Sequence, residues 1–137
     1  MTKLKAKVLI KKISENDVQR AIKDYLQVLE NQGKLMFIRN NSGAMPVKGQ
    51  NGKTRYIKFG KKGSPDILVW KPSAEWDDLA YRGVNVVRAI ALEIKSATGK
   101  ASPAQIEWQE KFEKLGGEYY IVKSYEDLLK IIWKKGN

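Results

Sequence analysis

Residues 63–70 read Gly-Ser-Pro-Asp-Ile-Leu-Val-Trp, and residues 89–96 read Ala-Ile-Ala-Leu-Glu-Ile-Lys-Ser. Each segment is an apolar run of strand length, with charged residues at one end. Asp66 opens the first predicted strand, and Glu93 and Lys95 stand two residues apart on the second. Because alternate residues of a strand share a face, we expect Glu93 and Lys95 to point the same way, with Ile94 buried behind them. The two segments therefore predict two carboxylates and one ammonium group gathered at strand ends.

Three helices are predicted around these strands. Ser14 is a good N-cap, and apolar residues follow it at helical spacing until the chain reaches Gly33. Ser102 caps a second helix that stops at Gly116 and Gly117, and Ser124 caps a third. Trp108 and Trp133 lie on the last two helices and are expected in the core.

The remaining strands complete a mixed sheet. Short strands are predicted over residues 35–39, 55–59 and 119–122, besides those at 66–70 and 86–95. Residues 40–54, rich in Asn, Gly and Lys, read as a loop, and the segment between Trp70 and Val86 reads as a long connection. The predicted order is an α/β fold, α-β-β-β-α-β-α, with helices packed on a mixed sheet. It forms a single domain over residues 14–137, preceded by a basic segment at 1–13 that is an arm or an edge strand.

The charge balance points to a polyanionic partner. The 137 residues contain 26 Lys and Arg against 15 Asp and Glu, a formal net charge of +11. Such an excess on a small domain favours nucleic acid, the alternative being a cationic surface that only maintains solubility.

The absence of two residue types narrows the chemistry further. There is no Cys and no His, which excludes thiolate catalysis, Cys-type zinc sites, Ser-His hydrolases and histidine-dependent nucleases. A bound metal must therefore be held by oxygen atoms, which points to Mg²⁺, with Mn²⁺ as a substitute. The general base must be a carboxylate, a perturbed lysine or metal-bound hydroxide.

The sequence pattern also argues against a membrane-spanning protein and against a protein that binds nucleotides through a phosphate-binding loop. No stretch approaches the ~20 apolar residues of a membrane span, and no signal peptide is evident, so we expect a cytoplasmic protein. Gly52-Lys53-Thr54 looks like the end of a phosphate-binding loop, but Val47 stands where that motif needs glycine. A strand rather than a helix is predicted to follow, so no nucleotide cofactor is expected.

Asp66 followed by Glu93-Ile94-Lys95, with Pro65 before Asp66, resembles the PD-(D/E)xK nuclease signature. Within that superfamily the chain resembles a stand-alone VRR-NUC domain over roughly residues 15–122. The resemblance rests on the following pieces in order: Glu15 with Gln19, the Arg39-Asn40-Asn41-Ser42-Gly43 loop, Gly63-Ser64-Pro65-Asp66, Glu93-Ile94-Lys95, and Ser102-Pro103-Ala104-Gln105. It implies a restriction-endonuclease-like fold.

The resemblance also implies roles for individual residues. Asp66 and Glu93 would hold Mg²⁺, with the backbone carbonyl of Ile94 and with Glu15, directly or through water. Lys95 would orient or deprotonate the attacking water, and Gln105 would lie beside the catalytic centre. Each has a purely structural alternative: a Glu93–Lys95 salt bridge, a helix-dipole role for Glu15 and a capping box for Gln105.

Basic and polar residues near the acidic centre are expected to bind the phosphate backbone of DNA. They cluster in sequence before Asp66, around residues 39–42 and after the second strand: Arg39, Asn41, Ser42, Lys58, Lys61, Lys62 and Lys100. Each alone is more often a solvated surface residue, and their clustering favours DNA.

The expected function is that of a magnesium-dependent endonuclease. The VRR-NUC resemblance implies branched DNA such as four-way junctions as substrate. The alternatives are a non-catalytic nucleic-acid-binding module of the same fold and a restriction-type nuclease that reads a base sequence. Because a four-way junction has two-fold symmetry and the chain has one such site, a homodimer is expected. Residues 7–13 and the connection between Trp70 and Val86 are the segments expected near its interface.

Overall fold

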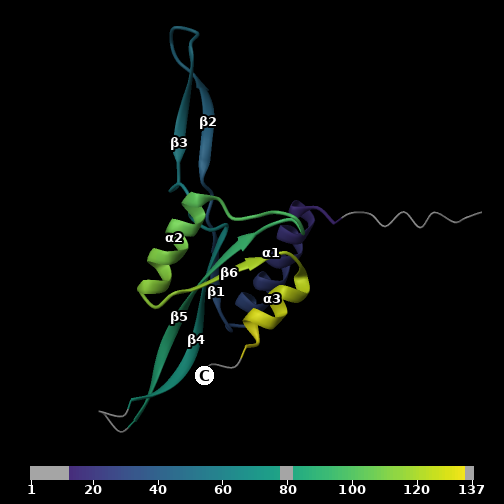
Figure 1. The fold of residues 1–137 in the computed structure, drawn as a ribbon, viewed down its shortest axis with the longest axis vertical. Helices are drawn as coiled ribbons and strands as arrows, with labels where there is room; N and C mark the ends of the chain where they lie inside the picture. The colour runs from purple at the N-terminus through teal and green to yellow at the C-terminus, as the bar shows by residue number, and fades with distance from the viewer. Residues whose placement is uncertain (1–12, 78–81, 135–137) are drawn as a thin grey trace, which may run out of the picture.

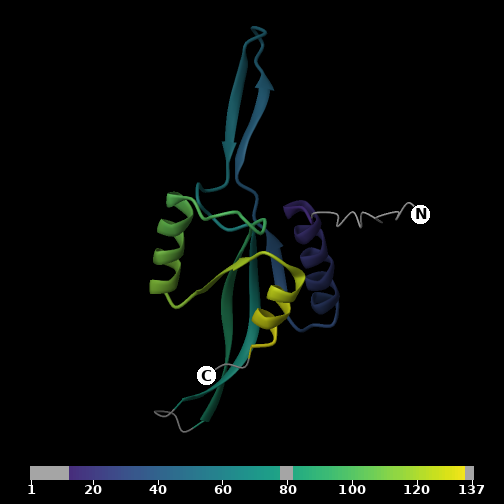
Figure 2. The same ribbon diagram turned by 45° about the vertical axis from the view of Figure 1, so that its right-hand side comes forward.

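The computed structural model describes residues 13–77 and 82–134 as three layers, with helices on both faces of a sheet (Figure 1). Helices α1 and α3 lie on one face and α2 on the other, as both ribbon views agree (Figure 2). The elements follow in the order α1 (Glu15–Asn31), β1 (Met36–Arg39), β2 (Gly43–Lys48), β3 (Thr54–Phe59), β4 (Ile67–Asp77), β5 (Arg82–Ile94), α2 (Pro103–Lys114), β6 (Glu118–Val122) and α3 (Tyr125–Ile132).

The main sheet has the strand order β1-β4-β5-β6. β4 runs antiparallel to both β1 and β5, whereas β6 runs parallel to β5. A parallel pair needs a crossover connection, and α2 supplies it. Taken without β2 and β3, the elements follow the predicted α-β-β-β-α-β-α order around a mixed sheet, which confirms the fold class.

The hydrophobic core lies between the sheet and the α1–α3 layer. Apolar residues of α1 at helical spacing meet alternate residues of β4 and β5. The fully buried members include Ile22, Leu26, Ile67, Ile90, Leu92, Ile94, Val122 and Leu128. No residue of α2 is fully buried, so the α2 face of the sheet is the less tightly covered one.

The predicted helix starts are confirmed. Ser14 and Asp17 form a capping box on α1, Ser102 and Gln105 form one on α2, and the Ser124 side chain accepts from the backbone of α3. These bonds satisfy backbone N–H groups that a helix leaves unpaired in its first turn.

Two predictions about connections were wrong. Residues 40–54 are not one loop, because Gly43–Lys48 forms β2, which pairs with β3 as a separate two-stranded sheet. Pro46 is tolerated there because a two-stranded ribbon has only edge strands. The segment between Trp70 and Val86 is not a long connection either, because β4 runs to Asp77 and β5 begins at Arg82.

A bidentate ion pair joins β5 to β6. Arg88 donates to both carboxylate oxygens of Glu118, with Nε 2.6 Å from Oε2, and the Tyr120 hydroxyl donates to Glu118 Oε1 at 2.8 Å. Arg88 lowers the pKa of Glu118 below its ordinary value. Of the predicted N-terminal arm, residues 1–13, all but Ile13 lie outside the described part of the chain.

Within the described ranges, no helix has the length and apolar character needed to cross a membrane.

Candidate active site

Asp66 and Glu93 lie side by side because of the β4–β5 register. Ile67 pairs with Leu92, so Asp66, one residue before β4, stands next to Glu93 on the neighbouring strand. The Asp66 carboxylate accepts a hydrogen bond from the backbone N–H of Ile94, with Oδ2 2.7 Å from the nitrogen. The two carboxylates predicted to meet at strand ends are thus brought together.

Asn40, the residue that follows β1, also fixes the backbone at Asp66. The Asn40 backbone N–H donates to the Asp66 carbonyl at 2.8 Å, and its side-chain Nδ2 donates to the Pro65 carbonyl at 2.9 Å. Asn40 therefore positions the Asp66 strand rather than presenting a free amide.

Glu93 is buried, with 3 % of its surface exposed. Its Oε1 accepts from Gln105 Nε2 at 2.7 Å and lies 3.3 Å from Lys95 Nζ. Its Oε2 is buried and has no hydrogen-bond partner. Burial first, and then the negative charge of Asp66, raise the pKa of Glu93 to about 7, while Lys95 opposes the shift. Glu93 is thus a carboxylate that lacks sufficient compensating charge.

Gln105 makes the predicted capping box and also reaches Glu93. Its Oε1 accepts from the Ser102 backbone at 2.9 Å and completes the capping box, while its Nε2 reaches Glu93. The cap holds the side chain in one orientation and so aims the amide at the carboxylate.

Glu15 lies in the exposed first turn of α1, and its charge contributes to the raised pKa of Glu93. Over residues 13–77 and 82–134, no group of three or more His, Cys, Asp or Glu side chains is arranged to hold a metal ion. Glu15 therefore does not complete a three-carboxylate cluster with Asp66 and Glu93.

A tyrosine that the sequence analysis missed lies beside this centre. Tyr119 of β6 pairs with Ala91, two residues before Glu93, and so shares the face of Glu93. Its hydroxyl is buried without a hydrogen-bond partner, and burial together with the charges of Glu93 and Asp66 raises its pKa. The parallel β5–β6 register could not be read from the sequence.

The residues present suit a divalent cation. Two adjacent carboxylates supply hard oxygen ligands, and the unpaired Glu93 Oε2 is an acceptor that a cation would satisfy. Lys95 alone does not neutralise the pair, since the pKa of Glu93 stays raised.

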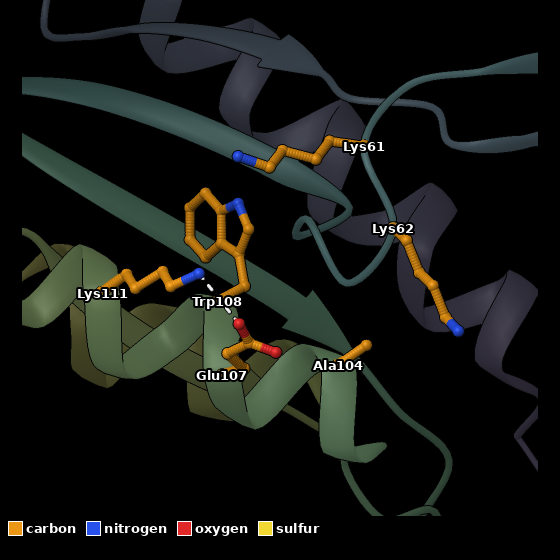
Figure 3. Close-up of a pocket in the computed structure, with 6 residues that line it drawn as sticks. All are labelled: Lys61, Lys62, Ala104, Glu107, Trp108 and Lys111. Atoms are coloured by element: carbon orange, nitrogen blue, oxygen red, sulfur yellow. Dashed lines mark hydrogen bonds and ion pairs between the residues drawn. The ribbon is translucent and has the colours of Figure 1, made fainter.

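The loop before Asp66 packs against the start of α2. A Cβ at Gly63 would lie 2.3 Å from the Ala104 carbonyl oxygen, and Gly63 has a φ of +81°, so only glycine fits. This contact leaves a hollow of about 260 Å³ between the loop and α2. Figure 3 shows Lys61 and Lys111 extending toward the Trp108 ring in this hollow, whereas Lys62 points away.

Trp108 is therefore not a core residue as predicted, but a half-buried ring that stacks on Phe112 and lines the hollow. Trp133, the other tryptophan expected in the core, is 52 % exposed.

The other residues predicted to bind DNA are all exposed and come from several elements. Arg39 ends β1, Asn41 and Ser42 lie between β1 and β2, and Lys58 lies on β3. Ser42, Lys58 and Lys62 share a second hollow of about 490 Å³ at the base of β2 and β3. Lys100 lies in the loop between β5 and α2.

The VRR-NUC domain family matches residues 13–126. The chain belongs to the VRR-NUC family. Comparison with curated proteins and with solved structures gives no significant match. As a VRR-NUC protein the chain carries a nuclease domain. Its Asp66, Glu93 and Lys95 lie at one end of the two central strands, β4 and β5, and Gln105 in the first turn of α2 bonds to Glu93. Membership of this family implies DNA as the substrate, and the net charge of +11 suits such a polyanion.

Proposed function

We propose that the chain is a magnesium-dependent endonuclease that cuts branched DNA at the Asp66–Glu93 centre. The observation that carries the proposal is the buried Glu93, with one oxygen unpaired, beside a second carboxylate and a lysine. A purely structural ion pair would leave neither an unsatisfied buried oxygen nor an adjacent like charge, because both are destabilising.

Asp66, Glu93 and the backbone carbonyl of Ile94 would hold the cation, with Glu15 reaching it through water. When bound, the cation would neutralise charge on the scissile phosphate and lower the pKa of a water molecule. Mn²⁺ would substitute for Mg²⁺, since both take oxygen ligands.

The protein's own side chains then have distinct tasks. Lys95 keeps its ammonium group within 3.3 Å of Glu93 Oε1 and can donate hydrogen bonds to the attacking water or to a phosphate oxygen, stabilising charge that develops there. Gln105 holds Glu93 Oε1 through its amide, so the carboxylate cannot rotate freely. Asn40 fixes the backbone from which Asp66 projects.

Exposed cations around this centre would bind the phosphate backbone. Lys61 and Lys62 stand on the loop that leads into Asp66, Arg39 ends the neighbouring strand β1, and Lys58 stands on β3 of the separate hairpin. Asn41, Ser42 and Lys100 would add contacts from the adjoining loops.

We further propose that the active species is a homodimer, because a symmetric junction requires two cuts and each chain has one Asp66–Glu93 centre. The β4–β5 hairpin is the candidate interface within the described residues. Sedimentation at micromolar concentration should give twice the monomer mass, and a strict monomer that makes paired simultaneous cuts would contradict the proposal.

The substrate proposal is tested by comparing a four-way junction with a linear duplex of the same sequence, in Mg²⁺, in Ca²⁺ and in EDTA. Cleavage of the junction in Mg²⁺, binding without cleavage in Ca²⁺ and no cleavage in EDTA are expected. Equal cleavage of both substrates would refute branch specificity, and cleavage in EDTA would refute metal dependence.

A further inference from the structure

The β2–β3 hairpin stands apart from the rest of the protein. It forms its own two-stranded sheet, and it projects away from the main sheet in both ribbon views (Figures 1 and 2). Every residue of β3 is exposed, and so is every residue of β2 except the half-buried Val47. A two-stranded hairpin is at best marginally stable in water, so this one is expected to gain order from a partner.

The pairing register gives the ribbon two different faces. Because Met45 pairs with Ile57 and Gly43 with Phe59, one face carries Met45, Val47, Ile57 and Phe59, together with Arg55. The opposite face carries Ala44, Pro46, Lys48, Thr54, Tyr56 and Lys58. One face is thus mainly apolar, and the other carries two lysines among smaller apolar and aromatic residues.

The charge of the β2–β3 hairpin favours an anionic partner. No Asp or Glu occurs between Glu30 and Asp66, whereas Lys48, Lys53, Arg55 and Lys58 all lie on the hairpin or its turn. Lys48, Lys53 and Arg55 line a further hollow at the tip. A polyanion is the partner that such a surface fits.

A second copy of the chain is the weaker candidate for the apolar face. Two six-residue strands, each about 20 Å long and occupying a width of ~5 Å, give a face of the order of 200 Å². A stable protein interface buries about 800 Å² on each partner. The ribbon face is too small to hold a dimer by itself, and Arg55 lies within it.

The base of the ribbon adjoins the candidate active site. The Phe59 ring covers Gly43, and a Cβ at Gly60 would lie 2.4 Å from the Asn41 carbonyl oxygen. The two strands of the ribbon are therefore in close contact where they join the rest of the protein. The chain then passes through Lys61 and Lys62 to Asp66. A DNA substrate at Asp66 that follows this path would meet the ribbon.

We infer that the β2–β3 ribbon is the element that recognises the branch in DNA. Its apolar face packs on the base pair that borders the branch point, and its cationic face binds the phosphates of an adjoining arm. Where the arms of a junction are not coaxially stacked, the base pair that borders the branch has a face without a stacking neighbour, which Met, Ile and Phe side chains can cover. A continuous duplex offers no such face. The inference rests on the proposed action on DNA and names the substrate feature that is read.

Binding measured by fluorescence anisotropy in Ca²⁺ separates the two faces without requiring cleavage. The apolar variant is Met45→Thr with Ile57→Thr, since both side chains are exposed, 54 % and 44 %, and threonine suits a strand. The cationic variant is Lys48→Gln with Lys58→Gln. Met36→Thr is the matched control, because Met36 is an exposed strand residue on β1, outside both the ribbon and the β4–β5 hairpin.

The apolar variant should bind a four-way junction about tenfold more weakly and bind the linear duplex as the unchanged protein does. The cationic variant should weaken binding to both DNAs alike, and Met36→Thr should weaken neither. Equal loss on junction and duplex by the apolar variant would overturn the inference, as would unchanged junction binding. If the apolar variant, and neither of the other two variants, sediments more slowly than the unchanged protein, the apolar face is a contact with a second copy of the chain. That result would also overturn the inference. If the unchanged protein binds neither DNA, the proposed function itself fails.

Discussion

Replacing Glu93 by glutamine should make the metal-free protein more stable at high pH. The Glu93 carboxylate is buried beside Asp66, and one of its oxygens has no partner. Glutamine has nearly the same shape and retains an oxygen that can accept from Gln105 Nε2. The substitution therefore removes the charge while it leaves the packing nearly unchanged.

The magnitude follows from the raised pKa. A carboxyl group whose pKa is about 7 in the folded protein and 4.5 when unfolded contributes stability that is fully present below pH 4.5 and is lost as the pH rises through 7. The shift corresponds to at most about 3 kcal/mol of the free energy of unfolding. Because glutamine leaves Lys95 without its charged partner, we expect a gain of about 1–2 kcal/mol at pH 9 and almost none at pH 5.

Urea unfolding in EDTA at pH 5, 7 and 9 measures this difference. Glu107→Gln is the control, since Glu107 is an exposed carboxylate paired with Lys111 on α2 and should give no gain that increases with pH. Addition of Mn²⁺ should stabilise the unchanged protein at pH 8 and leave the Glu93→Gln variant unaffected. A variant that is less stable than the unchanged protein at every pH would refute the reasoning about a destabilised carboxylate.

Three further perturbations test other parts of the account. Tyr119→Phe should leave the free energy of unfolding unchanged or raise it by up to about 1 kcal/mol, because the buried hydroxyl has no partner; a loss above that size in urea unfolding would indicate a hydrogen bond to a bound water. Lys61→Gln with Lys62→Gln should weaken binding to junction and duplex alike and flatten the slope of log affinity against log salt by about 2; an unchanged slope would exclude both side chains from phosphate binding. Arg88→Leu should lower the free energy of unfolding by roughly 1–3 kcal/mol near neutral pH. Arg88 lowers the pKa of Glu118, so the stability that this ion pair provides is present above the pKa that Glu118 has in the unfolded chain. It is lost as the pH falls through the pKa of Glu118 in the folded protein. Equal destabilisation by Arg88→Leu at pH 7 and pH 3 would contradict this prediction.

The sequence predicted the parts of the fold that local patterns determine. The capped helices at Ser14, Ser102 and Ser124 and the strands around Asp66 and Glu93 are signalled by N-caps and by apolar periodicity. Because neighbouring strands in a sheet align their ends, the meeting of Asp66 with Glu93 could be expected from the motif alone.

The rest depends on contacts between segments that are distant in sequence. The sequence predicts a loop over β2 because residues 40–54 are rich in Asn, Gly and Lys, and the strand becomes visible only through its pairing with residues 54–59. Tyr119 was missed because its place beside Glu93 depends on the parallel register of β6. The burial of Glu93 likewise depends on how α2 covers the sheet, through Gln105.

The most direct test of the central claim is the rate of junction cleavage in Mg²⁺ by the unchanged protein and by Glu93→Gln, at protein concentrations that saturate the DNA. The account predicts that Glu93→Gln binds the junction with unchanged or higher affinity, because a negative charge near the phosphates is lost, and cuts it about 10³-fold more slowly or not at all. Cleavage by Glu93→Gln at the rate of the unchanged protein would show that the Asp66–Glu93 centre is not the active site.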